Sequence, residues 1–180
     1  LKALIFQPKV KAGTKEPSEE QLGSLLAHYQ NGRYNDAEIA ARSLSIVFPR
    51  HTFSWKILGA VLKETGRLSE ALVTLEKIIE ITPDDAEAHS NLGITLKELG
   101  RLKEAEVSCR QAILFKPDFT EAYNNLGNTL EELGRLYEAE ACYVQAISLN
   151  PDYVEALYNL GNTLQELGRS EEAETSYTQA

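Results

Sequence analysis

Asparagine recurs at a fixed spacing in the second half of the chain. Asn91, Asn125 and Asn159 are separated by 34 residues each time. A carboxamide offers both a hydrogen-bond donor and an acceptor, so it can pair with a peptide unit whatever side chain that unit carries. The series therefore favours recognition of an extended polypeptide over catalysis.

The asparagines belong to a longer repeated segment. Glu121–Arg135 reads EAYNNLGNTLEELGR, and close variants occupy Glu155–Arg169, Glu87–Arg101 and, more loosely, Phe53–Arg67. Self-similarity at a period of about 34 residues is typical of a stack of small units, not of a globule with a single centre.

Glycine and proline divide each unit into two predicted helices, A and B. Glycines 34 residues apart, such as Gly100 and Gly134, stand where helix A should end, because glycine adopts a left-handed conformation without steric cost. Prolines such as Pro117 stand where helix B should end, and we expect them in the first turn of the next helix. Asp84 and its equivalents follow three of the prolines, where a carboxylate suits a helix N-terminus.

These signals predict a leader over residues 1–17 and a repeat array over residues 18–180. Ser18 with Gln21 forms a capping-box pattern at the start of the array. The predicted units span 18–51, 52–85, 86–119, 120–153 and an incomplete 154–180.

Apolar and small residues explain why the units should stack. Gly127 and its equivalents lie inside helix A, where glycine costs about 1 kcal/mol relative to alanine. Alanines such as Ala139 lie early in helix B, so we expect small residues to face one another and let the helices approach closely. We assign larger residues, including Tyr143, to the core.

The repeated pattern resembles the tetratricopeptide repeat. The residues that carry the resemblance are Trp55, Leu58, Gly59, Leu62, Gly66, Ala71 and Pro83, renewed as Tyr123, Leu126, Gly127, Leu130, Gly134, Ala139, Tyr143, Ala146 and Pro151. The units are also similar to the superhelical repeats of O-GlcNAc transferases and of bacterial tetratricopeptide proteins. The resemblance implies an all-α, right-handed solenoid of helix-turn-helix units whose A helices line a concave groove.

Helical spacing then identifies the residues expected to face this groove. The asparagines are Asn91, Asn124, Asn125, Asn128, Asn159 and Asn162, and the charged residues are Glu87, Glu121, Glu155, Lys56, Lys63 and Lys97. Ser90 and Tyr158 share the repeat position of Asn124, a position that we expect to be exposed.

The asparagines have two interpretations. Successive A helices lie roughly 10 Å apart and an extended peptide advances about 3.3 Å per residue, so one asparagine could meet every third residue of a bound strand. This arrangement is similar to the asparagine ladder of O-GlcNAc transferases. Alternatively, the asparagines tie neighbouring helices together.

Composition excludes several other functions. The chain has 180 residues and a formal net charge of −9, which argues against nucleic-acid binding. Cys109 and Cys142 have no partners at metal spacing, so we expect free thiols in a reducing, cytoplasmic setting. No apolar run is long enough to span a membrane. We expect no cofactor and no metal.

Catalytic groups are also not expected. His28, His51 and His89 are not placed beside a plausible nucleophile, and the glycines follow no strand, which excludes a phosphate-binding loop. A basic clamp for a C-terminal carboxylate would need Lys or Arg where Glu87 and Glu121 stand.

The sequence thus predicts a non-enzymatic scaffold that binds a protein or peptide segment in a polar, partly acidic groove. One alternative is the substrate-recruiting arm of a larger glycosyltransferase or sulfotransferase. Another is a self-assembling module that associates through the uncapped last repeat or the leader.

Overall fold

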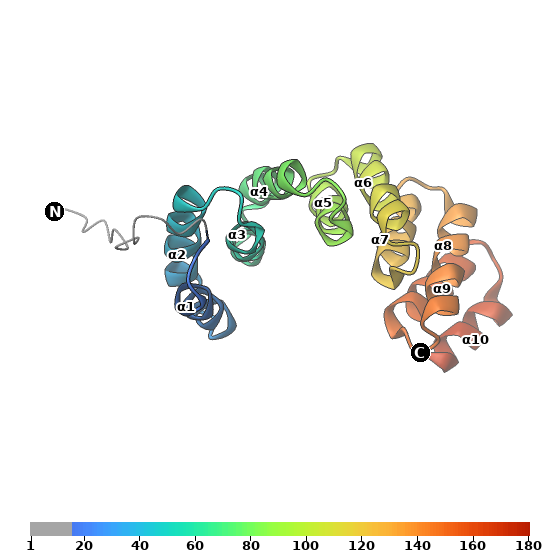
Figure 1. Cartoon of the computed structure of the whole chain (residues 1–180). Coiled ribbons are helices and arrows are strands. Elements are labelled where there is room, and N and C mark those ends of the chain that lie inside the picture. Colours follow the sequence, from blue (N-terminus) through green and yellow to red (C-terminus); the bar gives the residue numbers. More distant parts are fainter. Residues whose placement is uncertain (1–15) are drawn as a thin grey trace. The chain divides into compact units, whose positions relative to one another are not determined.

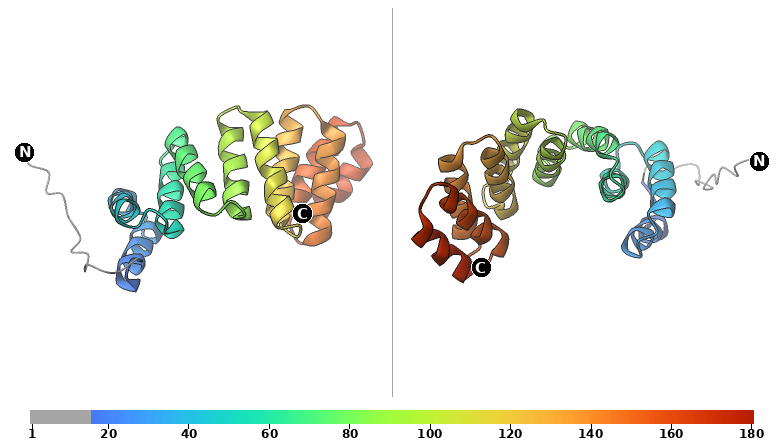
Figure 2. Two further views of the ribbon diagram at one scale, coloured as in Figure 1. Left: turned by 45° about the horizontal axis from the view of Figure 1, so that its top comes forward. Right: turned by 180° about the vertical axis from the view of Figure 1, so that it is seen from behind.

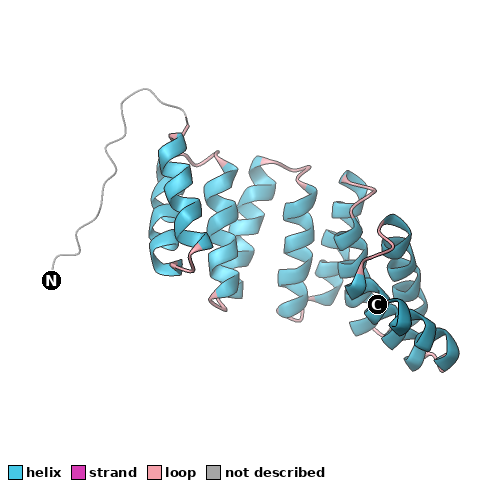
Figure 3. Ribbon diagram, turned by 90° about the horizontal axis from the view of Figure 1, so that it is seen from below, coloured by secondary structure: helices cyan, strands magenta, loops and turns pink. Residues whose placement is uncertain are grey.

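The computed structural model describes residues 16–180, so the predicted leader lies outside the described residues except for Glu16 and Pro17. Over the described part the chain is all α, without strands (Figures 1 and 3). The helices are α1 Glu19–Gln30, α2 Tyr34–Val47, α3 Thr52–Glu64, α4 Leu68–Ile81, α5 Ala86–Glu98, α6 Leu102–Phe115, α7 Thr120–Glu132, α8 Leu136–Leu149, α9 Val154–Glu166 and α10 Ser170–Gln179. The predicted fold class, an all-α repeat solenoid, is confirmed.

Two compact units make up the chain, with the division after Pro83. The first contains α1–α4 and the second contains α5–α10. Within each unit the helices pair in chain order, so that α3 packs on α4, α5 on α6, α7 on α8 and α9 on α10 (Figure 2).

The predicted glycine stops of the A helices are confirmed. Gly134 has φ of 73°, and the equivalent glycines have φ between 68° and 77°. The Gly134 amide donates to the Glu131 carbonyl (2.8 Å), and the Arg135 amide donates to the Leu130 carbonyl (2.9 Å). These two bonds satisfy carbonyls that the end of α7 would otherwise leave without donors.

The starts of the A helices differ partly from the prediction. The capping box of Ser18 and Gln21 is present. The prolines, however, lie in connecting turns, and α7 begins only at Thr120, three residues after Pro117. The N-cap of α5 is Asp85, whose carboxylate accepts from the Ala88 amide (3.0 Å), so Asp84 lies one residue too early to cap it.

Small residues are buried between paired helices as expected, but the partner of the helix A glycine differs. The alanines equivalent to Ala139 are at most 2% exposed. A Cβ built on Gly127 would lie 2.5 Å from Cε1 of Tyr143, so this glycine makes room for an aromatic ring and not for Ala139. Glycine is needed here because the Tyr143 ring occupies the space of a side chain.

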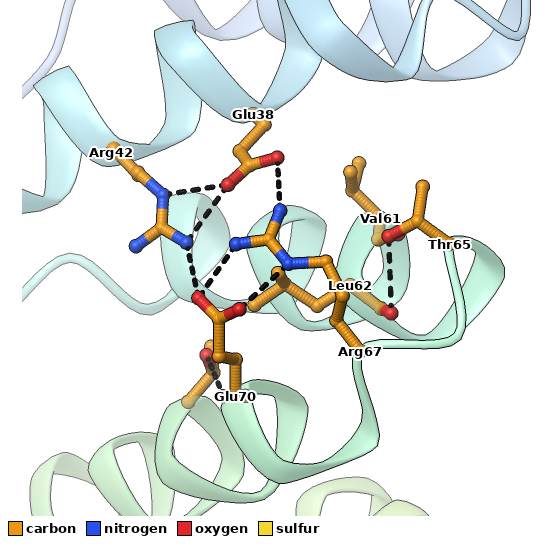
Figure 4. A network of polar contacts seen from close by, with 8 residues as sticks. Glu38, Arg42, Val61, Leu62, Thr65, Arg67 and Glu70 are labelled. Carbon is orange, nitrogen blue, oxygen red and sulfur yellow. Dashed lines mark hydrogen bonds and ion pairs between the residues drawn. The ribbon is translucent and has the colours of Figure 1, made fainter.

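Arginine–glutamate networks join successive helix pairs on the B-helix side. In the first unit, Arg67 donates to Glu38 on α2 (2.7 Å) and through two nitrogens to Glu70 (both 2.7 Å), while Arg42 contacts both glutamates (2.8 and 2.9 Å) (Figure 4). In the second unit, Arg135 similarly bridges Glu106 and Glu138. Burial raises the pKa of Glu38, but the hydrogen bonds from Arg67 and Arg42 outweigh it and lower the pKa below the usual value.

We predict that Gly127→Ala destabilises the second unit by about 1–3 kcal/mol, because the added Cβ overlaps a buried ring. Gly59→Ala is the matched control, since its Cβ would meet only Thr74 Cγ2 at an ordinary 3.5 Å. That control should be neutral or stabilising because alanine is the better helix former. Urea midpoints measured by circular dichroism would test the pair, and equal midpoints for the two variants would contradict the packing.

We predict that Glu38→Gln lowers stability at pH 7 by about 1–2 kcal/mol, between the values typical of exposed and buried pairs. A lowered folded-state pKa stabilises the protein above pH 4.5, the ordinary value for glutamate, and this stabilisation is lost as the pH falls below it. The difference between wild type and variant should therefore shrink in acid. Urea titrations at pH 7 and near pH 3 would measure it, with the exposed Glu76→Gln as control; a constant difference would refute the interpretation.

Candidate functional site

A hollow lies between the A helices α7 and α9 of the second unit. Its volume is about 570 Å³. We call it the α7–α9 hollow. It is lined by Asn124, Asn125, Asn128, Val154, Glu155, Tyr158, Asn159 and Ala180.

Asn159 connects the two helices that form the hollow. Its Nδ2 lies 3.0 Å from Oδ1 of Asn124 and 3.0 Å from Oδ1 of Asn128. Both amide protons of Asn159 are thus used inside the protein. Asn124 is only 4% exposed, although the sequence predicted an exposed position, because the neighbouring helix pair covers it.

The equivalent asparagine of the preceding repeat makes a similar contact. Nδ2 of Asn125 on α7 donates to Oγ of Ser90 on α5 (3.0 Å). Ser90 is also buried, at 3% exposed, where the sequence predicted exposure. Asn91, by contrast, is exposed at the surface of α5. Asn125 and Asn159 therefore tie neighbouring A helices together, which is one of the two interpretations of the asparagine series.

Tyr143 on α8 extends this hydrogen-bond network. Its hydroxyl lies 2.8 Å from Oδ1 of Asn128 and 2.8 Å from Oε2 of Glu131, and the Thr163 hydroxyl donates to the same Glu131 oxygen (3.2 Å). Burial and the nearby carboxylate of Glu131 raise the pKa of Tyr143 well above its usual value, so the hydroxyl stays protonated.

Glu155 supplies the one charged side chain among the lining residues. Oε2 of Glu155 accepts from the Tyr153 hydroxyl (2.8 Å), and burial together with this carboxylate raises the pKa of Tyr153. Tyr158 beside it is 56% exposed, with its ring centroid 5.7 Å from that of Tyr177. The hollow thus combines amides, one carboxylate and one accessible aromatic ring.

The remaining predicted groove residues lie elsewhere. Lys97 forms an ion pair with Glu132 on α7 (2.8 Å), and Asn162 accepts from the Tyr177 hydroxyl (2.8 Å). Glu87 and Glu121 are exposed but do not line the hollow, and Lys56 and Lys63 belong to the first compact unit.

The repeat position that Tyr158 shares with Asn124 predicts an exposed side chain, and Tyr158 is 56% exposed and lines the hollow. Val154 and Ala180 also line the hollow, but no sequence signal predicts this, because their position depends on how α9 and the end of α10 pack.

The two cysteines and His89 take part in packing. Cys109 is buried and Cys142 is half-buried, and burial raises the pKa of their thiols to about 12 and about 11. The ring of His89 packs against Phe115, with centroids 5.3 Å apart. Within residues 16–180, no group of three or more His, Cys, Asp or Glu could hold a metal ion, and no helix is long and apolar enough to cross a membrane.

Comparisons with known proteins agree with this architecture. Sequence models described as tetratricopeptide repeat match residues 86–119 and 118–180, and one described as TPR repeat matches residues 59–100. The chain therefore belongs to the tetratricopeptide repeat family, and the resemblance stated from the sequence is confirmed. No curated protein matches the chain.

Solved structures of MamA share the fold. MamA residues 41 to the end from Desulfovibrio magneticus RS-1 superimposes with a TM-score of 0.82 at 17% identity, covering 93% of this chain and 94% of that one. Another MamA crystal structure gives a TM-score of 0.78 at 22% identity, covering 85% and 90%. At such low identity the likeness concerns the fold alone.

We predict that Asn159→Ala destabilises the second unit by about 1–3 kcal/mol, because it leaves the buried Oδ1 of Asn124 without its donor. Asn91→Ala, at the equivalent but exposed position, should change stability by less than about 0.5 kcal/mol. Urea midpoints would compare the two variants. Equal, small effects would show that the asparagines do not tie the helices together.

Proposed function

We propose that the protein binds an extended segment of a partner protein in the α7–α9 hollow. The observation that carries the proposal is the hollow itself, whose lining includes two pairs of equivalent repeat positions on successive A helices, Asn124 with Tyr158 and Asn125 with Asn159. Tetratricopeptide repeat proteins generally bind protein partners, and this hollow is a depression in the second unit that could receive one.

The internal hydrogen bonds change how the asparagines would act. Asn125 uses one amide proton on Ser90 and Asn159 uses both on Asn124 and Asn128, so the Oδ1 atoms of these two side chains would act as acceptors for a ligand. A bound segment would donate its backbone amides or side-chain protons to these oxygens. The rigid network fixes the oxygens in advance, which reduces the entropy lost on binding.

The expected affinity of the amide contacts is small. Two hydrogen bonds at a net 0.5–1.5 kcal/mol each provide about 1–3 kcal/mol, which corresponds to binding weaker than millimolar. Side-chain contacts to Tyr158 and Glu155 must therefore add to them. A partner that also engages other repeats would gain further through avidity.

We predict that peptides selected from a random dodecapeptide display library bind in the hollow. Their affinity for the Asn125→Ala protein should be about five- to tenfold lower than for the wild type, because the substitution removes one acceptor. Lys103→Ala, an exposed change on the B helix α6, should leave affinity unchanged. Fluorescence anisotropy would measure both. Selected peptides that bind both variants as tightly as wild type would place the binding surface elsewhere.

Two other functions use the same scaffold. The repeats could recruit substrates for a larger enzyme of the glycosyltransferase or sulfotransferase type, in which case the hollow would hold a segment of the substrate protein. Self-assembly through the last repeat or the leader is the second. Light scattering over a concentration series separates self-assembly from capture of a foreign peptide.

A further inference from the structure

The hydrogen bonds of the α7–α9 hollow make it rich in acceptors. The amide nitrogens of Asn125 and Asn159 donate within the protein, to Ser90 and to the two asparagines of α7. Asn159 has used both amide protons and keeps its carbonyl oxygen for a ligand, whereas Asn125 keeps its carbonyl oxygen and one amide proton. The Glu155 carboxylate adds further acceptor positions. An ionised carboxylate accepts about four hydrogen bonds, and among the described residues the Tyr153 hydroxyl donates one of them.

The charge of the surroundings has the same sign as this carboxylate. Residues 84–180 contain 18 Asp and Glu against 7 Lys and Arg, a formal charge of −11. None of the eight residues that line the hollow is basic. A cationic group would therefore be attracted toward the hollow and would meet no competing cation inside it.

The remaining lining residues suit a long side chain with a planar charged end. The Tyr158 ring is 56% exposed, and a guanidinium placed over an aromatic ring is favoured by about 0.5–2 kcal/mol. Val154, 54% exposed at the start of α9, offers apolar surface for the methylene stem of such a side chain.

We propose that the hollow is a pocket for an arginine side chain carried by the partner's extended segment. This inference rests on the proposed function and specifies its partner. Arginine has five donors in a planar fork and no acceptor, so it complements the Glu155 carboxylate, the Asn159 carbonyl oxygen and the aromatic face of Tyr158. Lysine has three donors around a point charge and lacks the planar group that stacks on tyrosine.

The test compares two peptides that differ in one group. Acetyl-GSGRGSG-amide carries arginine, and its partner carries citrulline, a neutral urea of the same shape. Titrations followed by 15N NMR should show the arginine peptide binding at least about fivefold tighter. They should also shift the side-chain amide signals of Asn125 and Asn159. Equal affinity for the two peptides would overturn the inference.

Matched variants separate a local contact from general attraction. Glu155→Gln removes the carboxylate in the hollow, whereas Glu166→Gln removes the same charge from the exposed end of α9. The preference for arginine over citrulline should disappear in the first variant and persist in the second. Equal preference in both variants would show attraction by net charge alone and would contradict the pocket.

Two further outcomes distinguish this inference from the proposed function. Library-selected peptides that bind at the hollow without a basic residue would refute the arginine pocket and leave the proposed function intact. A peptide of residues 1–15, LKALIFQPKVKAGTK, serves as competitor because it carries four lysines. If it displaces the arginine peptide at equal or lower concentration, the occupant is a lysine-bearing segment of a second copy, which also refutes the proposal.

Discussion

The contact between Gly127 and the ring of Tyr143 is the constraint on which the rest of the second unit depends. The missing side chain of Gly127 leaves the space into which the ring fits. The ring is completely buried, and its hydroxyl reaches Asn128 and Glu131 on the preceding A helix. Those two residues in turn accept from Asn159 and from Thr163 on α9. A close approach of two helices thereby fixes the hydrogen bonds that shape the hollow.

The glycine at this repeat position faces a different neighbour in each repeat. Its equivalent Gly161 faces the ring of Tyr177, Gly93 faces the thiol of Cys109, and Gly59 meets Thr74 at an ordinary distance. Among these neighbours, only tyrosine carries a hydroxyl that reaches from helix B to a side chain of helix A. The repeats with tyrosine at this position are also those whose A helices line the hollow, so the same residue influences both the packing of the repeats and the lining of the hollow.

The fold and part of the site could be predicted from the sequence. The sequence pattern and backbone chemistry are enough to predict the period of 34 residues, the glycines that end the A helices and the buried alanines. Of the predicted groove residues, Asn124, Asn125, Asn128, Asn159 and Glu155 line one hollow. Lys97 does not, because it lies on α5; its amine pairs with Glu132 of the neighbouring repeat, an ion pair that a single repeat does not reveal.

The sequence by itself determined that helix pairs must stack, because each pair has an apolar face that only its neighbour can cover. It also determined where the helices end, since glycine's left-handed conformation is a property of that residue alone. Only the tertiary structure decided which way each asparagine points its donors. Asn124 and Asn159 stand one helical position apart in their repeats, and their hydrogen bond exists only once α7 and α9 lie side by side. Whether an amide binds a partner or its own neighbour is a matter of distances between repeats, which no single repeat encodes.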